Sequence, residues 1–167
     1  AFHEWSTLTP VERGHILFKY VDQMRASESI LTEYVARETG KSNKDAFGEV
    51  QGSIAQGEYF AGEGRRLYGR SLTSGVSGKY SHTVRVPLGV AGLIVPANTP
   101  IANIAWKIFP ALICGNTVVL KASEDSPEVA LIMAKLAKKA GVPNGVVNVI
   151  QGLGLSAGSP IVESEKV

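Results

Sequence analysis

The order of apolar segments after residue 90 constrains the fold of this chain more than any other feature. Three short apolar runs, residues 90–95, 117–120 and 146–150, have the length and composition of buried strands. Two longer segments, residues 101–114 and 127–140, separate these runs and have the apolar periodicity of helices. The alternation of strand and helix predicts an α/β fold with a parallel sheet whose strands are covered on both faces.

The part of the chain before this alternation is predicted to be helical. Thr9-Pro10-Val11-Glu12 has the sequence of a capping box with proline at the first helical position, so a helix is expected to begin there. A second helix should begin near Ser27 and end at Gly40, and a third should run from about Lys44 to Ala61. In the third helix we expect four side chains to be buried: Phe47, Val50, Ile54 and Phe60.

A change in composition suggests a boundary between two parts of the chain. Residues 62–78 are rich in glycine and serine and are expected to form a loop. Residues 80–86 loosely alternate apolar and polar side chains, which predicts a half-buried strand. We therefore divide the chain into a helical segment with its linker, residues 1–78, and a Rossmann-like domain with a parallel sheet, residues 79–167; the family resemblance described below implies that these residues are the first half of such a domain.

Ligands of parallel sheets bind beyond the carboxyl ends of the strands, which here are residues 96–98, 121–124 and 151–154. Asn98 lies between two prolines, and its amide could donate to a ligand or bond to its own turn. Lys121 could reach ligand hydroxyls or phosphates, or extend to water. Glu124 could accept hydrogen bonds from a ribose, or belong to a solvated turn.

The glycine pattern disfavours an ordinary Rossmann dehydrogenase. Gly152-Leu153-Gly154 begins the dinucleotide fingerprint but does not complete it, because Ala157 stands where the third glycine would be. The turn after the first predicted strand, residues 96–100, contains no glycine. Trp106 and Phe109 are interpreted as core residues of the following helix.

Composition excludes several classes of function. The net charge of +2, with both signs interspersed, favours neither nucleic acid nor an anionic membrane as a partner. The apolar runs are too short to span a bilayer. The single cysteine, Cys114, and three widely spaced histidines form no recognisable metal site, and Cys114 is expected to be a buried structural thiol. Such sparse cysteine usage agrees with a reducing, cytoplasmic location.

Several strings resemble the aldehyde dehydrogenase family with that family's spacing, across nearly the whole chain. The strings are Val86-Pro87-Leu88-Gly89-Val90, Ile94-Val95-Pro96-Ala97-Asn98-Thr99-Pro100, Lys107-Ile108-Phe109-Pro110-Ala111-Leu112, Gly115-Asn116-Thr117-Val118-Val119-Leu120-Lys121 and Ala140-Gly141-Val142-Pro143-Asn144-Gly145-Val146-Val147-Asn148. Upstream, Glu12-Arg13, Glu38-Thr39-Gly40-Lys41 and Tyr59-Phe60-Ala61-Gly62 resemble the family's helical region.

The resemblance implies NAD- or NADP-dependent oxidation of an aldehyde to an acid, through a cysteine thiolate and a glutamate-activated water. Asn98 matches the asparagine that helps to hold the oxyanion, and the resemblance also places Asn98 at the cofactor. Lys121 and Glu124 match the pair that binds the adenosine ribose, and Glu124 favours NAD because it would repel a 2′-phosphate. The other residues that the resemblance places at the cofactor are Ile94, Val95, Pro96, Ala97, Ser123, Gly154 and Gly158.

The chain also departs from the family pattern. Ala97 stands where tryptophan is frequent and Thr99 where an aromatic residue is frequent, and these changes could widen the site or alter the packing of the nicotinamide. In the family the nucleophilic cysteine, the general-base glutamate, the catalytic domain and most of the oligomer interface follow the position of Val167. A segment before Ala1 is also expected. We therefore expect this chain to have no catalytic activity alone, and to work within a homo-oligomeric enzyme.

Two other interpretations remain at this point. The chain could be a truncated, non-catalytic module that binds a nucleotide or a protein. It could also belong to a semialdehyde or acyl-phosphate reductase of the same superfamily. If the chain exists alone, the uncovered sheet edge and helix faces predict aggregation or obligate association.

Overall fold

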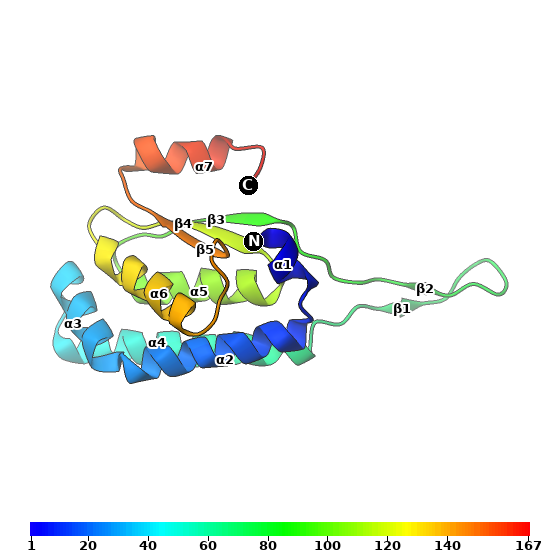
Figure 1. Ribbon diagram of the computed structural model, residues 1–167, viewed down its shortest axis with the longest axis horizontal. Helices are drawn as coiled ribbons and strands as arrows, with labels where there is room; N and C mark the ends of the chain where they lie inside the picture. Colours follow the sequence, from blue (N-terminus) through cyan, green and yellow to red (C-terminus); the bar gives the residue numbers. More distant parts are fainter.

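The computed structural model describes all residues, 1–167, and confirms the predicted α/β class (Figure 1). Its helices are α1 (Phe2–Thr7), α2 (Pro10–Ala26), α3 (Glu28–Thr39), α4 (Asn43–Gly62), α5 (Pro100–Ile113), α6 (Pro127–Lys139) and α7 (Ser159–Glu163). Its strands are β1 (Ser71–Leu72), β2 (Ser81–His82), β3 (Val90–Ile94), β4 (Thr117–Lys121) and β5 (Val147–Ile150). A 3-10 turn spans Glu63–Arg65, and a π-helical turn spans Gly154–Gly158.

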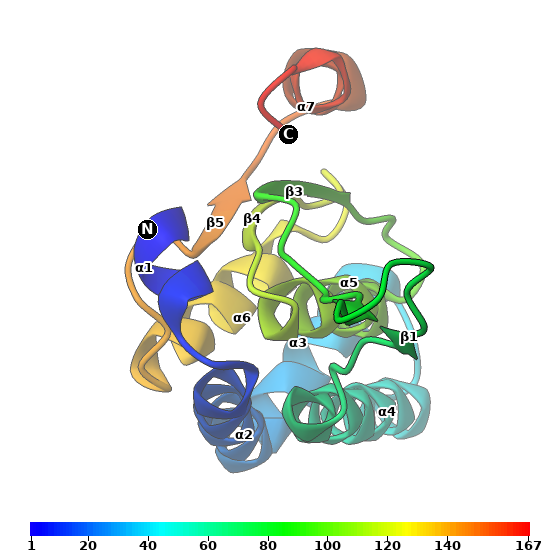
Figure 2. The same cartoon turned by 90° about the vertical axis from the view of Figure 1, so that its right-hand side faces the viewer.

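Strands β3, β4 and β5 form a parallel sheet with β4 in the centre. Helix α5 connects β3 to β4, and α6 connects β4 to β5, as the sequence predicted. Figure 2 shows α5 and α6 against one face of the sheet, with α2 and α4 as a further layer beneath them. Only the short α7 lies over the opposite face.

One hydrophobic cluster joins the helical segment to the sheet domain. It contains 31 buried residues, drawn from α2, α3 and α4 as well as from α5, α6 and the sheet. Trp5 donates from its indole nitrogen to the carbonyl oxygen of Leu112 at 3.1 Å. The fully buried Tyr20 donates to the carbonyl oxygen of Met133 at 2.9 Å, and burial raises the pKa of its phenol. The division of the chain at residue 78 stays a prediction.

The predicted burial of helix α4 was partly wrong. Val50 and Ile54 are buried, but Phe47 is 46% exposed and Phe60 is only half-buried. The buried face of α4 is made largely of small residues because other helices approach it closely. A methyl group on Gly57 would lie only 2.8 Å from Cζ of Phe109 in α5. Phe47 therefore lies outside the core, whereas the half-buried Phe60 packs against its margin.

The predicted half-buried strand at residues 80–86 was also wrong. Only Ser81–His82 forms a strand, and every residue from 80 to 86 is exposed. This strand pairs antiparallel with β1 in an arm that extends away from the body of the molecule (Figure 1). The loose alternation of apolar and polar residues gives no burial there because no second layer of structure covers the arm.

The sheet is not covered on both faces along its whole length, contrary to the expectation for residues 90–95. In β3, Leu93 is buried against the helices whereas Ile94 is 41% exposed on the other face. On that outer face α7 and the last residue approach β3 closely. A methyl group on Gly92 would lie 2.4 Å from Cγ2 of Ile161 and 2.7 Å from Cγ1 of Val167. Glycine at this position is what allows the close approach.

Candidate functional site

The three strand ends singled out by the sequence lie side by side. Ile94 pairs in register with Lys121, and Lys121 pairs with Ile150. Backbone hydrogen bonds continue one residue further, from Val95 N to Lys121 O and from Ala122 N to Ile150 O. The segments that follow β3, β4 and β5 therefore begin at one edge of the sheet, which is the edge where α/β folds bind their ligands.

Lys121 and Glu124 form an ion pair at the end of the central strand. Lys121 Nζ lies 2.6 Å from Glu124 Oε2, and the lysine side chain is only 4% exposed whereas the glutamate side chain is 44% exposed. The sequence left open whether the Lys121 side chain would reach a ligand or extend to water. Its burial excludes extension to water. The hydrogen bond from Lys121 is the main cause that lowers the pKa of Glu124. The site thus presents a fixed carboxylate to solvent at the sheet edge.

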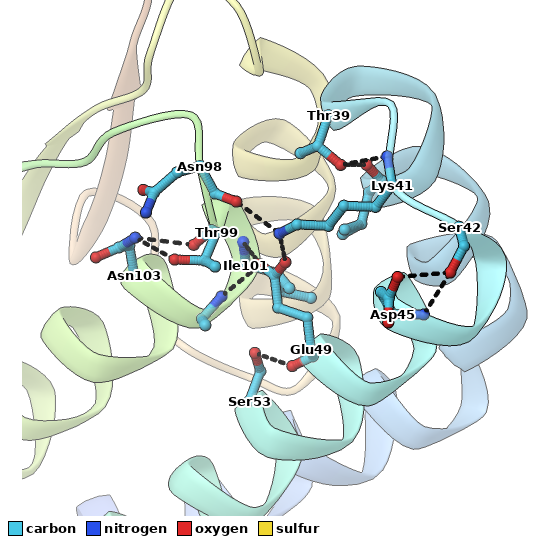
Figure 3. A network of polar contacts seen from close by, with 12 residues as sticks. Thr39, Lys41, Ser42, Asp45, Glu49, Ser53, Asn98, Thr99, Ile101 and Asn103 are labelled. Atoms are coloured by element: carbon cyan, nitrogen blue, oxygen red, sulfur yellow. Dashed lines mark hydrogen bonds and ion pairs between the residues drawn. The ribbon is translucent and has the colours of Figure 1, made fainter.

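The turn that follows β3 presents the side chain of Asn98. Pro96 and Pro100 flank this turn, and Pro100 begins α5. Asn98 is exposed, and Figure 3 shows its carboxamide pointing away from Lys41 with no bond drawn to it. The amide does not bond to its own turn, so it is free to donate to a ligand. Asn103 holds the next residue, since its Nδ2 donates to the carbonyl oxygen of Thr99 at 3.0 Å and to its hydroxyl at 2.8 Å.

Two charged residues from the helical segment hold the same turn, and sequence reasoning assigned no role to either (Figure 3). Lys41 Nζ donates to the backbone carbonyl oxygen of Asn98 at 2.5 Å and to the carboxylate of Glu49. The other oxygen of Glu49 accepts from the amides of Ile101 at 3.1 Å and Ala102 at 3.2 Å. Glu49 therefore caps α5 from a different helix, while Thr99 at the N-cap position makes no side-chain cap.

Helix α6 is capped in the same manner. Glu38 accepts from the amides of Glu128 at 2.6 Å and Val129 at 3.1 Å. From the sequence alone, Ser126 directly before Pro127 predicts a serine cap for this helix, but its hydroxyl is buried and has no hydrogen-bond partner. That prediction was wrong because the glutamate from α3 occupies the position at the helix end that the serine hydroxyl would need.

The remaining predicted cofactor residues differ in what they can offer a ligand. Val95 is 3% exposed and belongs to the core, so only its backbone can face a cleft. Pro96 is exposed and Ala97 is half-buried on the turn after β3. Ser123 accepts from the amide of Asp125 at 3.3 Å in the turn after β4. A methyl group on the buried Gly158 would lie 4.0 Å from Ile94 Cδ1, whereas Gly154 faces open space.

Two residues that the sequence placed in the interior lie at the surface instead. Cys114 is exposed, because it follows the last turn of α5 and Gly115 immediately turns the chain toward β4. Trp106 is 53% exposed and lines a pocket beside the Asn98 turn, together with Lys41, Glu49 and Thr99. Phe109 is fully buried, as predicted.

Lys107 is a further site residue that sequence reasoning did not single out. Its ammonium donates to the backbone carbonyl oxygen of Ile94, at the end of β3. The only sequence signal was its place in the string from Lys107 to Leu112.

No helix of the structure combines the length and apolar character that crossing a membrane requires.

Comparison with known proteins identifies the family. The aldehyde dehydrogenase family model matches residues 1–167. Mouse "Aldehyde dehydrogenase, cytosolic 1" is 40% identical over 158 residues, which are 94% of this chain and 31% of the mouse protein. "D-glyceraldehyde dehydrogenase (NADP(+))" of Picrophilus torridus is 39% identical, over 100% of this chain and 34% of that protein.

Solved structures agree with the sequence relatives. The crystal structure of PnpE in complex with nicotinamide adenine dinucleotide is 36% identical, with a TM-score of 0.97, and the match covers 100% of this chain and 34% of that one. The chain therefore spans about a third of the length of the relatives it matches. On the match along its whole length, the chain belongs to the aldehyde dehydrogenase family.

Proposed function

We propose that this chain is the cofactor-side part of an NAD(P)-dependent aldehyde dehydrogenase, in which it supplies cofactor-cleft residues and an oxyanion donor. The observation that carries the proposal is the juxtaposition of two groups at one sheet edge. The Lys121–Glu124 pair ends β4, and the unbonded carboxamide of Asn98 follows the neighbouring β3. The family membership gives this arrangement its chemistry.

The ion pair suits the ribose of a nicotinamide cofactor. Glu124 Oε2 is engaged by Lys121, and the half-exposed carboxylate retains acceptor capacity for adjacent sugar hydroxyls. The carboxylate would repel a 2′-phosphate, which favours NAD over NADP. Ile94, Pro96, Ala97, Ser123, Gly154 and Gly158, together with the backbone of Val95, would line the rest of the cleft. When bound, NAD(P) supplies the hydride acceptor.

Asn98 would act on the aldehyde oxygen. When a thiolate attacks the aldehyde carbon, negative charge develops on that oxygen, and the carboxamide of Asn98 can donate a hydrogen bond to it. The thiolate and the general base would come from parts of the enzyme other than residues 1–167. Cys114 is not proposed as the nucleophile, because it lies at the end of α5 beside β4, away from Asn98. We further propose a cytoplasmic location and a homo-oligomer for the whole enzyme.

The first experiment is to purify the intact polypeptide that carries this segment from its native source. Its mass is measured, and it is assayed with a panel of aldehydes and either NAD or NADP. We expect a chain longer than these 167 residues, NAD-dependent formation of the acid, and a lower KM for NAD than for NADP. No oxidation of any aldehyde by the intact protein would refute the proposal. It would favour the alternative, a non-catalytic nucleotide-binding or interaction fragment.

The role of Asn98 has its own test. Asn98→Ala should lower kcat roughly 100- to 1,000-fold, as removal of one oxyanion donor does in other enzymes, and should change the affinity for NAD much less. Asn144→Ala is the matched control, because Asn144 is an exposed asparagine that precedes β5 at the opposite edge of the sheet. Equal rates for the two variants would remove Asn98 from the mechanism.

A further inference from the structure

We infer that Lys41 and Glu49 are positioning residues for Asn98, which they act on through the main chain of its turn. The inference rests on the proposed function, because it concerns how the oxyanion donor is held. Neither residue has to touch the substrate. Glu49 provides the fixed point in this arrangement, and Lys41 connects that point to the turn (Figure 3).

Glu49 is fixed because its carboxylate is almost fully enclosed. Its side chain is 6% exposed, and such a buried charge is tolerated only when it is paired and hydrogen-bonded. One oxygen accepts from the amides of Ile101 and Ala102, where the positive end of the α5 dipole adds to the attraction. Its other oxygen pairs with Lys41. The carboxylate therefore moves together with the amino end of α5.

Lys41 connects this carboxylate to Asn98, which lies two residues before α5 begins. Its ammonium has three donors, of which one bonds to Glu49 and another to the carbonyl oxygen of Asn98. A hydrogen bond to this carbonyl restrains the peptide plane between Asn98 and Thr99. Pro96 and Pro100 flank the turn and have a fixed φ, so they also limit how the backbone can move Asn98.

The contact is made to the main chain, and this matters for function. A bond from Lys41 to the carboxamide would occupy the group that has to face the substrate. The bond to the carbonyl leaves the carboxamide unbonded, and it points away from Lys41 (Figure 3). The arrangement thus orients the carboxamide of Asn98 and leaves its N–H groups available to the substrate. Preorganisation of this kind is what makes such donors effective in the transition state.

The turn between α3 and α4 holds Lys41 in place by local interactions. Gly40 ends α3 with φ of 71°, a left-handed conformation that suits glycine, and its amide donates to Ala36. The Lys41 amide donates to the hydroxyl of Thr39 at 3.3 Å, and Ser42 caps α4 by accepting from Asp45 at 3.1 Å. The turn from Thr39 to Ser42 therefore fixes the point from which the Lys41 side chain reaches the Asn98 turn.

The test compares Lys41→Met with a matched control, Lys44→Met, in the intact enzyme. Lys44 is an exposed lysine of α4 whose side chain makes no hydrogen bond or ion pair. Lys41→Met should lower kcat roughly tenfold, because misplacing a reacting group by about 1 Å costs up to about 100-fold. The KM for NAD should stay unchanged. Lys44→Met should keep the wild-type kcat, and Lys41→Arg should recover most of the lost rate.

A double variant separates positioning from a general loss of stability. If Lys41 acts through Asn98, Lys41→Met should lower the rate no further in an Asn98→Ala background. Independent, multiplying effects would overturn the inference. It would also be overturned by a kcat of Lys41→Met equal to that of Lys44→Met, or by a raised KM for the aldehyde at unchanged kcat, which would put Lys41 on the substrate. A wild-type enzyme that oxidises no aldehyde would instead refute the proposed function.

Discussion

Helices α2 and α5 both begin with amides that a glutamate caps, but the two glutamates come from different places in the chain. In α2, Glu12 lies three residues after Thr9, and each residue caps the other's backbone amide. In α5 the capping glutamate is Glu49, 52 residues earlier in the sequence than Ile101. The local cap stabilises one helix, whereas the distant cap also fastens one layer of the molecule to another.

This difference follows the positions of the two helices. The amino end of α2 is exposed, and its cap is formed entirely by Thr9 and Glu12 of the same turn. Helices α5 and α6 each follow a strand, and their amino ends lie at the sheet edge where the candidate site is formed. Capping these ends from α3 and α4 makes the geometry of the site depend on the packing of the helical segment.

The largest effect on stability is expected from Glu49→Ala. This variant leaves two partly buried amides of α5 without an acceptor and Lys41 without its counter-ion, at a cost of about 2–3 kcal/mol. Urea unfolding of the intact protein measures the loss, and hydrogen exchange at Ile101 and Ala102 locates it. Glu33→Ala, at an exposed glutamate of α3, is the control with no expected effect. Equal stability of the two variants would contradict the comparison.

A smaller loss is expected from Glu38→Ala at the start of α6. Glu38 is half-buried and also caps two amides, but the end of α6 that it caps is more exposed than that of α5. We expect a cost of about 1–2 kcal/mol, with faster hydrogen exchange at Glu128 and Val129. Exchange at Ile101 should not change. Faster exchange at both helices would show that the two caps act as one unit.

The same contrast explains what the sequence could predict. The capping box of α2, the stop at Gly40 and the alternation of strand and helix are local patterns, and the structure confirms them. The caps of α5 and α6 depend on contacts between residues that are distant in sequence. Ser126 was wrongly expected to cap because its position and residue type fit, and nothing nearby in sequence indicates that Glu38 caps the helix instead.

Burial was predicted least well where it depends on which layers exist and how closely they approach. Phe47 has helical spacing relative to Val50 and Ile54, but α4 turns its small residues toward its neighbours. Residues 80–86 have a weak strand pattern, but no layer lies over their arm. For the site, the sequence located Asn98, Lys121 and Glu124 at the strand ends. The side-chain roles proposed for them still await the tests above.

The smallest effect is expected at the local cap of α2. Thr9→Ala removes one acceptor from an exposed helix end and should cost up to about 1 kcal/mol, with faster exchange confined to the first turn of α2.

The wild-type capping box of α2 also predicts a pH dependence of stability. The bond from the backbone amide of Thr9 is the main cause that lowers the pKa of Glu12. Because this pKa is lower in the folded state, the stabilisation is present above the ordinary carboxyl pKa. It should be lost as the pH falls through the lowered value. An NMR titration that gives Glu12 an ordinary pKa would show that the capping box does not persist in solution. The comparison between a local cap on α2 and a distant cap on α5 would then no longer hold.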